Sequence, residues 1–303
     1  MKSILDFAIL SKGLSPKDKV KLALFALGLK PATSIYLKID SNNLDETYFL
    51  ENALRLYKII FLRGNEKSFE EVKRIKENKI AWNLAGLWID YDLFHTQKQK
   101  ENFLKYKKLC LTDKGTKKRN TIAGKLYDYP ECCIEQYSKE TPQHIKSKYS
   151  TYQFYKNLHA IEKKFYLMPY TPCSLKCKRS IELQKKYSVA LKKTSPSFYQ
   201  HLNEANPYQT DIIIESENDI LANEKSIWKQ KDGHDYVVLS TRPYQSKHWF
   251  YNILSKKKYA IGTVLSATII HHTTYADIIL GKEKGIILDL QHYRNLPLLK
   301  RKY

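Results

Sequence analysis

The chain has 303 residues, of which 43% are hydrophobic and 13% aromatic, a composition that indicates a folded globular protein rather than a disordered one. Its 52 Lys and Arg residues outnumber its 31 Asp and Glu residues, which gives a formal net charge of +21. No apolar run approaches the roughly 18 to 20 residues of a membrane span, and the first residues are typical of an amphipathic helix rather than a signal peptide. We therefore expect a cytoplasmic protein without a membrane partner, long enough for two domains.

The first part of the chain, residues 1–110, is predicted to be a small α/β unit. Apolar spacing typical of helices occurs over residues 3–29 and is interrupted at KGLSP, which indicates two short helices. Ser15 and Pro16 suit the N-cap and the first turn of the second helix. A serine side chain accepts hydrogen bonds from free N–H groups there, and proline has no N–H to leave unpaired.

Residues 33–89 supply the other elements of this unit. TSIYLKI alternates and is rich in β-branched and aromatic residues, so residues 33–39 predict a strand. Residues 43–58 have helical spacing after an acidic first turn, and IIFLRGN indicates a short buried strand. SFEEVKRIKENKIAWNLAGLWI, residues 68–89, is predicted to be a helix that is broken near Asn78. Strands and helices that alternate in this way are typical of an α/β unit.

Two further segments follow a charged, glycine-containing loop over residues 111–120, which marks a domain edge. Residues 111–205 are predicted to be a helical cysteine module, with helices over residues 142–167 and 174–193. Residues 206–303 consist of short β-rich runs separated by Gly, Asn, Asp and Lys clusters, which predicts a largely antiparallel segment. The predicted fold class is therefore α+β.

Four of the five cysteines lie in two short motifs of the central module. YPECCIEQY places Cys132 and Cys133 in the first turn of a predicted helix, directly after Pro130. PYTPCSLKCKRS places Cys173 and Cys177 at the start of another helix, on one face if that helix begins at Cys173. Unpaired N–H groups and the helix dipole stabilise negative charge at such N-termini, so thiolates are favoured there. We therefore expect the two motifs to meet in a pocket suited to anionic sulfur.

The residue types leave three uses of this pocket open. The first is a metal site, because thiolates are soft ligands for zinc or an iron–sulfur cluster. The spacing matches neither C-x-x-C zinc knuckles nor common ferredoxin runs, and adjacent cysteines seldom share one ion. A metal site would then use three cysteines and another ligand, or a cluster of several metals. The second use is a disulfide pair, and the third is redox catalysis or simple burial of free thiols.

The two motifs also resemble those of a known family. IAGKLYDYPECCIEQY is similar to the G-K-L-L-G-Y-P-x-C-C-V-x-x-F signature of the archaeal domain-of-unknown-function family 483. PYTPCSLKCKRSIELQKKY is similar to that family's H-x-P-C-S-x-x-C-x-x-S-x-x-L-x-x-x-Y pattern, so the resemblance covers residues 122–187. The motif positions that the resemblance implies are Tyr129, Pro130, Cys132, Cys133, Pro172, Cys173, Ser174, Cys177 and Ser180.

This sequence departs from the family pattern at two positions. Asp128 stands where the pattern has a glycine before Tyr-Pro, and Tyr170 stands where it has a histidine before x-Pro-Cys. If that histidine is a ligand in relatives, the site here takes another ligand or binds differently. The family's activity is not established, so the resemblance implies a site and not a reaction or substrate.

Histidines are the other candidate ligands. His201, which follows the second helix of the module, is favoured over His159, which lies in an apolar helical stretch and is expected to pack. His271 and His272 would point to opposite faces of a strand, so at most one of them faces any site. Cys110 has no partner cysteine in the sequence and is expected in the core.

The positive charge makes RNA a candidate partner, in an alternative interpretation in which the cysteines are only structural. Lysines interleave with aromatic residues in KSKYSTYQFYKNLH, and aromatic platforms beside lysines suit single-stranded RNA. A helix with a buried tyrosine face and solvated lysines accounts for the same pattern, and lysine excess also arises from genome composition or a thermophilic surface. If RNA binds, Tyr149, Tyr152 and Tyr155 should be exposed within a continuous lysine face. The chain lacks the glycine motifs of P-loop ATPases, Rossmann dehydrogenases and α/β-hydrolases.

Overall fold

The computed structural model of the chain comprises two compact units. It describes residues 2–40, 43–74, 81–111, 116–139, 160–161, 163–203, 206–215, 228–231, 234–240, 264–271 and 275–288. The first unit comprises Met1–Glu70, Leu84–Ile145 and Lys164–Gln200, and the second comprises Glu71–Asn83, Lys146–Lys163 and His201–Tyr303. Within the described residues, no helix combines the length and apolar character needed to cross a bilayer. The three-part domain division given above stays a prediction.

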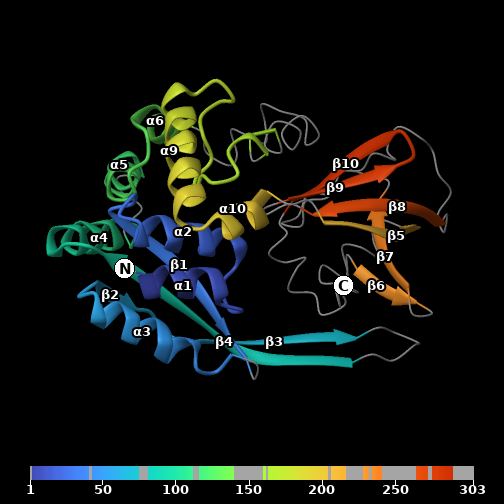
Figure 1. Ribbon diagram of the computed structural model, residues 1–303, viewed down its shortest axis with the longest axis horizontal. Coiled ribbons are helices and arrows are strands. Elements are labelled where there is room, and N and C mark those ends of the chain that lie inside the picture. The colour runs from blue at the N-terminus through green and yellow to red at the C-terminus, as the bar shows by residue number, and fades with distance from the viewer. Residues whose placement is uncertain are drawn as a thin grey trace. The chain divides into compact units, whose positions relative to one another are not determined.

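The chain is a mixed α+β protein, as predicted, with helices gathered in the first unit and a six-stranded sheet in the second (Figure 1). The described helices are α1 (Lys2–Leu10), α2 (Pro16–Ala26), α3 (Glu46–Leu56), α4 (Gln97–Cys110), α5 (Thr116–Leu126), α6 (Glu131–Lys139), α9 (Lys178–Thr194) and α10 (Pro196–Asn203). The described strands are β1 (Ala32–Ile39), β2 (Ile60–Arg63), β3 (Lys67–Arg74), β4 (Ala81–Phe94), β5 (Asn206–Glu215), β6 (Trp228–Lys231), β7 (His234–Ser240), β8 (Val264–His271), β9 (Tyr275–Leu280) and β10 (Glu283–Leu288).

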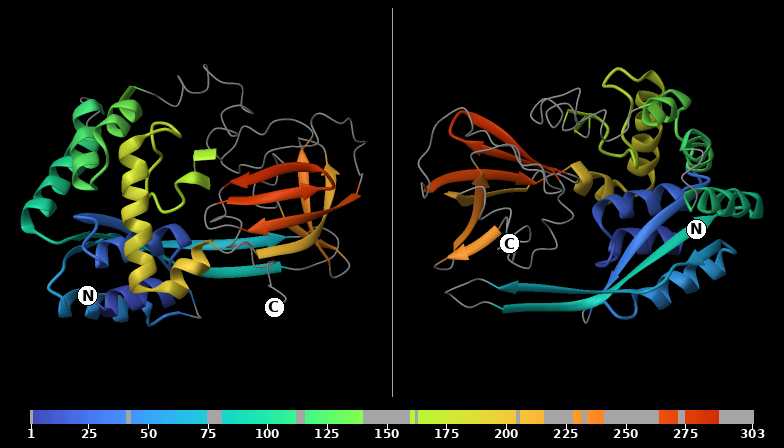
Figure 2. Two further views of the ribbon diagram at one scale, coloured as in Figure 1. Left: turned by 45° about the horizontal axis from the view of Figure 1, so that its top comes forward. Right: turned by 180° about the vertical axis from the view of Figure 1, so that it is seen from behind.

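The first sheet is built around the long strand β4. Strands β1 and β2 both pair antiparallel with β4, which gives the order β1-β4-β2, and β3 pairs with β4 outside this path. In the β1–β4 pair, Ala32 lies opposite Phe94 and Ile39 lies opposite Leu87. Figures 1 and 2 show β3 and β4 as a two-stranded ribbon. Helices α2 and α3 pack against β1, so the sheet and the N-terminal helices share one core.

The helix predicted over residues 68–89 is wrong, because this stretch forms β3 and much of β4. The sequence LWIDYDLF, residues 87–94, carries the alternation that is typical of a strand. Ile89, Tyr91 and Leu93 recur at every second position and are buried, while Asp90 between them is only partly buried. That period is typical of a strand. Pairing of β4 with its neighbours supplies its backbone hydrogen bonds, and this tertiary context overrides the helical spacing of the charged segment before it.

The other elements predicted for the N-terminal unit are confirmed. Ser15 is the N-cap of α2, and its side chain accepts a hydrogen bond of 3.1 Å from the N–H of Asp18, with Pro16 in the first turn. The strand predicted over residues 33–39, the helix over 43–58 and the short strand after it correspond to β1, α3 and β2. Local sequence patterns are therefore enough to predict these elements.

Helices α4 and α5 join the sheet to the cysteine motifs. The capping box of α4 uses Thr96 and Gln99, each of whose side chains accepts a hydrogen bond from the other's backbone N–H. A buried cluster then packs Phe94 of β4 against Phe103 of α4 and Leu126 of α5. The position of α6, which follows α5 after a short turn, is therefore set by the core of the sheet.

Two boundaries in the predicted helical module change. The loop predicted over residues 111–120 is wrong in its second half, because α5 begins at Thr116. The helix predicted to start at Ser174 begins instead at Lys178, and this alters how the second cysteine motif is presented. Most of the helix predicted over residues 142–167 lies outside the described residues.

The second unit contains a six-stranded, largely antiparallel sheet, as its β-rich sequence predicts. The strand order is β10-β9-β8-β5-β7-β6. Strand β5 pairs antiparallel with β8 and parallel with β7. His271 ends β8, whereas His272 and the run WFYNIL lie outside the described residues.

The close approach of α5 and α6 generates a first prediction. A Cβ added at Gly124 of α5 would lie 2.3 Å from both Cδ1 and Cγ1 of Ile134 of α6. Overpacking costs about 1–3 kcal/mol, which exceeds the gain of roughly 1 kcal/mol from replacing a helical glycine by alanine. We expect Gly124→Ala to lower the midpoint of urea denaturation.

Lys125→Ala is the matched control, because Lys125 is the next residue of α5 and is exposed. Its denaturation midpoint should equal or exceed that of the wild type. A Gly124→Ala variant that is more stable than the wild type would show that α5 and α6 do not pack as closely as described.

Candidate metal centre

Four sulfur atoms from two distant parts of the chain meet in the first unit. The Sγ atoms of Cys132, Cys133, Cys173 and Cys177 all lie within 4.8 Å of one another. Cys177 Sγ is 3.7 Å from Cys132 Sγ and 3.8 Å from Cys133 Sγ. The two sequence motifs therefore come together at one point, as expected from the sequence.

The first pair of sulfurs is presented by the first turn of α6. Pro130 precedes the helix, and its carbonyl accepts hydrogen bonds of 2.9 and 3.0 Å from the N–H groups of Cys133 and Ile134. Cys132 is exposed and Cys133 is buried, since neighbouring helical residues point about 100° apart. Burial of Ile134 beside Gly124 of α5 fixes the rotation of α6 about its axis.

The second pair comes from a turn and a helix cap. Cys177 is the N-cap of α9 in an extended conformation, and Cys173 lies before the helix. Because the helix does not begin at Cys173, the two cysteines do not share one helical face. The Cys177 N–H donates to the Ser174 carbonyl at 3.2 Å, and the Cys173 N–H donates to Cys133 Sγ at 3.4 Å. Backbone as well as sulfur thus connects the two motifs.

A buried serine in the first turn of α9 contacts two of the sulfurs. Ser180 has no exposed surface, and its hydroxyl donates to Cys177 Sγ at 3.2 Å. The same oxygen lies 3.5 Å from Cys133 Sγ and 3.1 Å from the hydroxyl oxygen of Tyr170. The sequence motif contains Ser180 without assigning it a role. Its position after a cysteine N-cap is the signal that could have found it.

These surroundings separate the pKa values of the thiols. Burial acts to raise the pKa of Cys177, but hydrogen bonds with Ser180, Cys132 and Cys173 outweigh it and bring this pKa down to about 7. Burial, with the neighbouring sulfurs, raises the pKa of Cys173 far above its usual range. Burial likewise raises the pKa of Cys133. Of these three thiols, Cys177 therefore most readily carries negative charge, as expected at a helix N-terminus.

The clustered sulfurs are close but not bonded to one another. All five cysteines of the chain are free thiols. The S···S separations of 3.7 and 3.8 Å exceed the disulfide bond length of about 2.05 Å. Four sulfurs at such distances surround a space that could hold a metal ion. Both adjacent cysteines belong to this group, so the four thiols form a set of four donors and the expected set of three cysteines with another ligand is not the one that the structure shows.

The other cysteine and the favoured histidines lie elsewhere. The core position expected for Cys110 is wrong, because it ends α4 and is exposed. Helix α4 buries only Phe103, so the apolar residues near Cys110 do not reach the core. His201 is exposed on α10 and is not among the ligand atoms that group with the sulfurs. His159 lies outside the described residues.

Comparison with known proteins points to the same part of the chain. Residues 94–201 match the model of a family described as "Protein of unknown function (DUF483)". This region, about a third of the chain, is similar to the DUF483 family. The match confirms the resemblance carried by the two cysteine motifs, and it runs from the end of β4 into α10. No curated protein and no solved structure matches the chain.

The structure describes both positions at which this sequence departs from the expected motif pattern. Asp128, at the place of the glycine, has a φ of 56°, in the left-handed region that glycine adopts freely and aspartate visits more readily than most residues. Tyr170, at the place of the histidine, forms a hydrogen bond with Ser180. The four thiols group together without a side chain from position 170, so this set of donors does not require a histidine there.

The contact between Ser180 and Cys177 yields a second prediction. Ser180→Ala removes the hydroxyl that stabilises the Cys177 thiolate, so the pKa of Cys177 should rise from about 7 toward or above the ordinary thiol range. The ultraviolet absorbance of thiolate, followed against pH in reduced, metal-free protein, measures this change.

Ser188→Ala is the control, because Ser188 lies further along α9 and its hydroxyl donates to Tyr199 rather than to a sulfur. Its thiolate titration should match that of the wild type. If Ser180→Ala also titrates like the wild type, the hydroxyl does not set the charge of Cys177.

Proposed function

We propose that the DUF483 region binds one zinc ion through Cys132, Cys133, Cys173 and Cys177, and that this ion holds two parts of the fold together. The distances between the sulfurs carry the proposal. In a tetrahedral zinc site with Zn–S bonds of about 2.3 Å, neighbouring sulfurs lie about 3.8 Å apart. Cys177 Sγ lies 3.7 and 3.8 Å from its two partners on α6.

The size of the cluster favours a single ion over an iron–sulfur cluster. Four atoms that all lie within 4.8 Å of one another are at most roughly 2.9 Å from a common centre, little more than one metal–sulfur bond. In a four-iron cluster the cysteines bind different irons, so their sulfurs stand outside a cage of irons and sulfides. That cage requires wider spacing. A single iron ion has the same geometry as zinc, and metal analysis separates the two.

The ligand set supports a structural role. Structural zinc sites have four protein ligands, whereas catalytic sites keep one position open for water or substrate. The ligands come from α6 and from the turn that precedes α9, so the ion would cross-link two segments that are distant in sequence. Metal binding displaces the thiol protons, and the pKa values of Cys133 and Cys173 are raised. Affinity should therefore fall as pH falls.

Loss of Cys177 tests the proposal. Serine is a poor replacement for a thiolate, so Cys177→Ser should lose most of its zinc, while the wild type carries one zinc per chain. Structural zinc contributes on the order of 10 kcal/mol in zinc-finger peptides, and the core around α4 and α5 softens that loss here. We expect a lower melting temperature together with reduced metal content, measured by elemental analysis and calorimetry.

Cys110→Ser is the control, because Cys110 is exposed and outside the cluster. It should keep the metal content and melting temperature of the wild type. Wild-type values for both quantities in Cys177→Ser would mean that the four cysteines are packed thiols that hold no metal. Iron and inorganic sulfide in place of zinc would mean that the cluster rearranges around an iron–sulfur centre.

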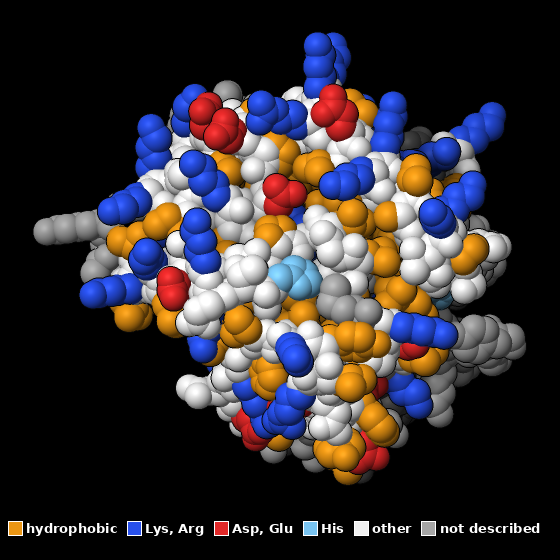
Figure 3. Space-filling view, turned by 60° about the vertical axis from the view of Figure 1, so that its left-hand side comes forward, with side chains coloured by type: hydrophobic (Ala, Val, Ile, Leu, Met, Phe, Trp, Pro, Cys, Tyr) orange, Lys and Arg blue, Asp and Glu red, His pale blue; other side chains and the backbone are white. Residues whose placement is uncertain are grey.

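RNA contact through the lysine-rich surface is a second proposal, which the net charge of +21 supports. On the face shown in Figure 3, Lys and Arg side chains are interspersed with acidic, apolar and uncharged groups. Tyr149, Tyr152 and Tyr155 lie outside the described residues. RNA binding should weaken steeply as salt rises, since each neutralised phosphate releases counterions. Absence of binding to single-stranded RNA at low salt would end this proposal.

A further inference from the structure

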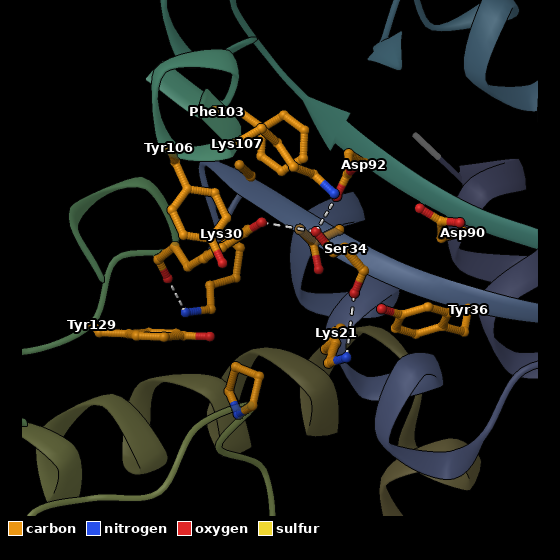
Figure 4. Close-up of a pocket in the computed structure, with 14 residues that line it drawn as sticks. Lys21, Lys30, Ser34, Tyr36, Asp90, Asp92, Phe103, Tyr106, Lys107 and Tyr129 are labelled. Atoms are coloured by element: carbon orange, nitrogen blue, oxygen red, sulfur yellow. Dashed lines mark hydrogen bonds between the residues drawn. The ribbon is translucent and has the colours of Figure 1, made fainter. Parts of the chain in front are cut away.

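A polar pocket lies on the sheet of the first unit, apart from the sulfurs. Ser34 and Tyr36 of β1 lie opposite Asp92 and Asp90 of β4, and strand alternation places all four on one face. With side chains from α4 and the α5–α6 turn, they line a pocket of about 280 Å³ (Figure 4). The neighbouring strand positions carry the buried apolar core, so packing does not explain the polar residues on this face.

A buried lysine forms one wall of the pocket. Lys30 is only 2% exposed, and its amine donates a hydrogen bond to the backbone carbonyl of Tyr127. The amine lies 4.8 Å from the centre of the Tyr129 ring, beside which it is seen in Figure 4. The rings of Tyr170 and Tyr187 are 5.8 and 5.9 Å away. The ion pairs found among the described residues do not include this amine.

This environment shifts the Lys30 amine toward its neutral form. Burial lowers the pKa of Lys30 from 10.5 to about 8, against the opposing charge of Asp128. Burial raises the pKa values of the surrounding tyrosines, to about 12 for Tyr129 and Tyr106, so their hydroxyls stay protonated. At pH 7 the amine is neutral in roughly a tenth of molecules, against about one in three thousand for an ordinary lysine. A neutral amine has a free electron pair.

We propose that the Lys30 amine condenses with the carbonyl group of a small, neutral hydroxy-aldehyde or hydroxy-ketone bound in this pocket. The nitrogen attacks the carbonyl carbon and passes one proton to the oxygen, which gives a carbinolamine. The oxygen then takes a second proton and leaves as water, and a protonated C=N bond remains without any oxidant or reductant. Its N–H can still donate to the Tyr127 carbonyl, and the tyrosine ring faces stabilise its positive charge. Desolvation is an established route to nucleophilic lysines.

The charges that line the pocket favour a neutral ligand with hydroxyl groups. Lys21 is paired with Asp18 at 2.7 Å. Burial raises the pKa of Asp92, while a hydrogen bond from the Ser34 hydroxyl and the charge of Lys107 oppose that rise. Lys21 and Lys107 are thus already opposed by carboxylates, so an anionic ligand gains little from these two lysines. The carboxylate oxygens can accept hydrogen bonds from ligand hydroxyls.

A chain of exchangeable protons borders the same space. The Ser34 hydroxyl donates to Asp92 and lies 2.8 Å from the hydroxyl oxygen of Tyr127. This chain joins β1, β4 and the end of α5, and it can supply the proton with which water leaves. The pocket therefore combines a nucleophile, a proton source and acceptors for hydroxyl groups.

Reductive trapping tests the proposal. The metal-containing protein is incubated at pH 7 with glyceraldehyde and cyanoborohydride, and modified lysines are mapped by mass spectrometry. Lys30 should be labelled at least about tenfold more than Lys38, which is also buried but does not line the pocket. Labelling of Lys30 should saturate with glyceraldehyde concentration and rise with pH only up to about 8.

Two variants separate binding from reactivity. Lys30→Arg keeps a cation but cannot form an imine, so saturable labelling should disappear. Asp90→Asn removes a charge from the pocket wall and should raise the half-saturating glyceraldehyde concentration several-fold. Equal labelling of Lys30 and Lys38 in the wild type, or labelling that never saturates, would contradict the proposal. Lys30 would then only pack within the tyrosine cage formed by the rings of Tyr129, Tyr170 and Tyr187. This comparison within the wild type does not depend on whether either variant folds.

Discussion

Two helix N-termini meet at the cysteine cluster, and the middle of the first unit depends on that junction. Cys133 in the first turn of α6 and Cys177 at the N-cap of α9 lie where helix dipoles and free N–H groups favour negative charge. The Cys173 N–H completes the contact by donating to Cys133 Sγ. Four thiolates packed so closely would repel one another, so protons or a cation must balance them. A bound metal ion would do so while adding bonds between the two segments.

The same junction shapes the wall of the Lys30 pocket. Ser180 links Cys177 to the hydroxyl of Tyr170, and the Tyr170 ring lies 4.5 Å from the ring of Tyr129. Both rings face the amine of Lys30. An ion held by the cysteines would therefore fix one side of the tyrosine cage, and loss of that ion should loosen the pocket as well as the fold.

Features encoded by neighbouring residues could be predicted from the sequence, and features that depend on distant contacts could not. The N-cap at Ser15, the cysteines at helix starts and the α+β class follow from local patterns. The stretch over residues 68–89 becomes strand because β3 pairs with β4 and the end of the stretch pairs with β1, contacts that its helical spacing does not reveal. Lys30 precedes a proline and belongs to no motif. It becomes notable only because the α5–α6 turn and α9 fold over it. Cys110 is exposed because α4 presents a mostly polar surface.

The central claim is that one metal ion is bound by four sulfurs and by nothing else. X-ray absorption at the metal edge of the purified protein tests it most directly, because the spectrum reports the number, type and distance of the ligands. The account predicts zinc with four sulfur neighbours at about 2.3 Å and no second metal nearby. The account would be contradicted by a nitrogen or oxygen ligand, or by scattering between two metals. It would also be contradicted if protein purified from a metal-replete medium held no metal.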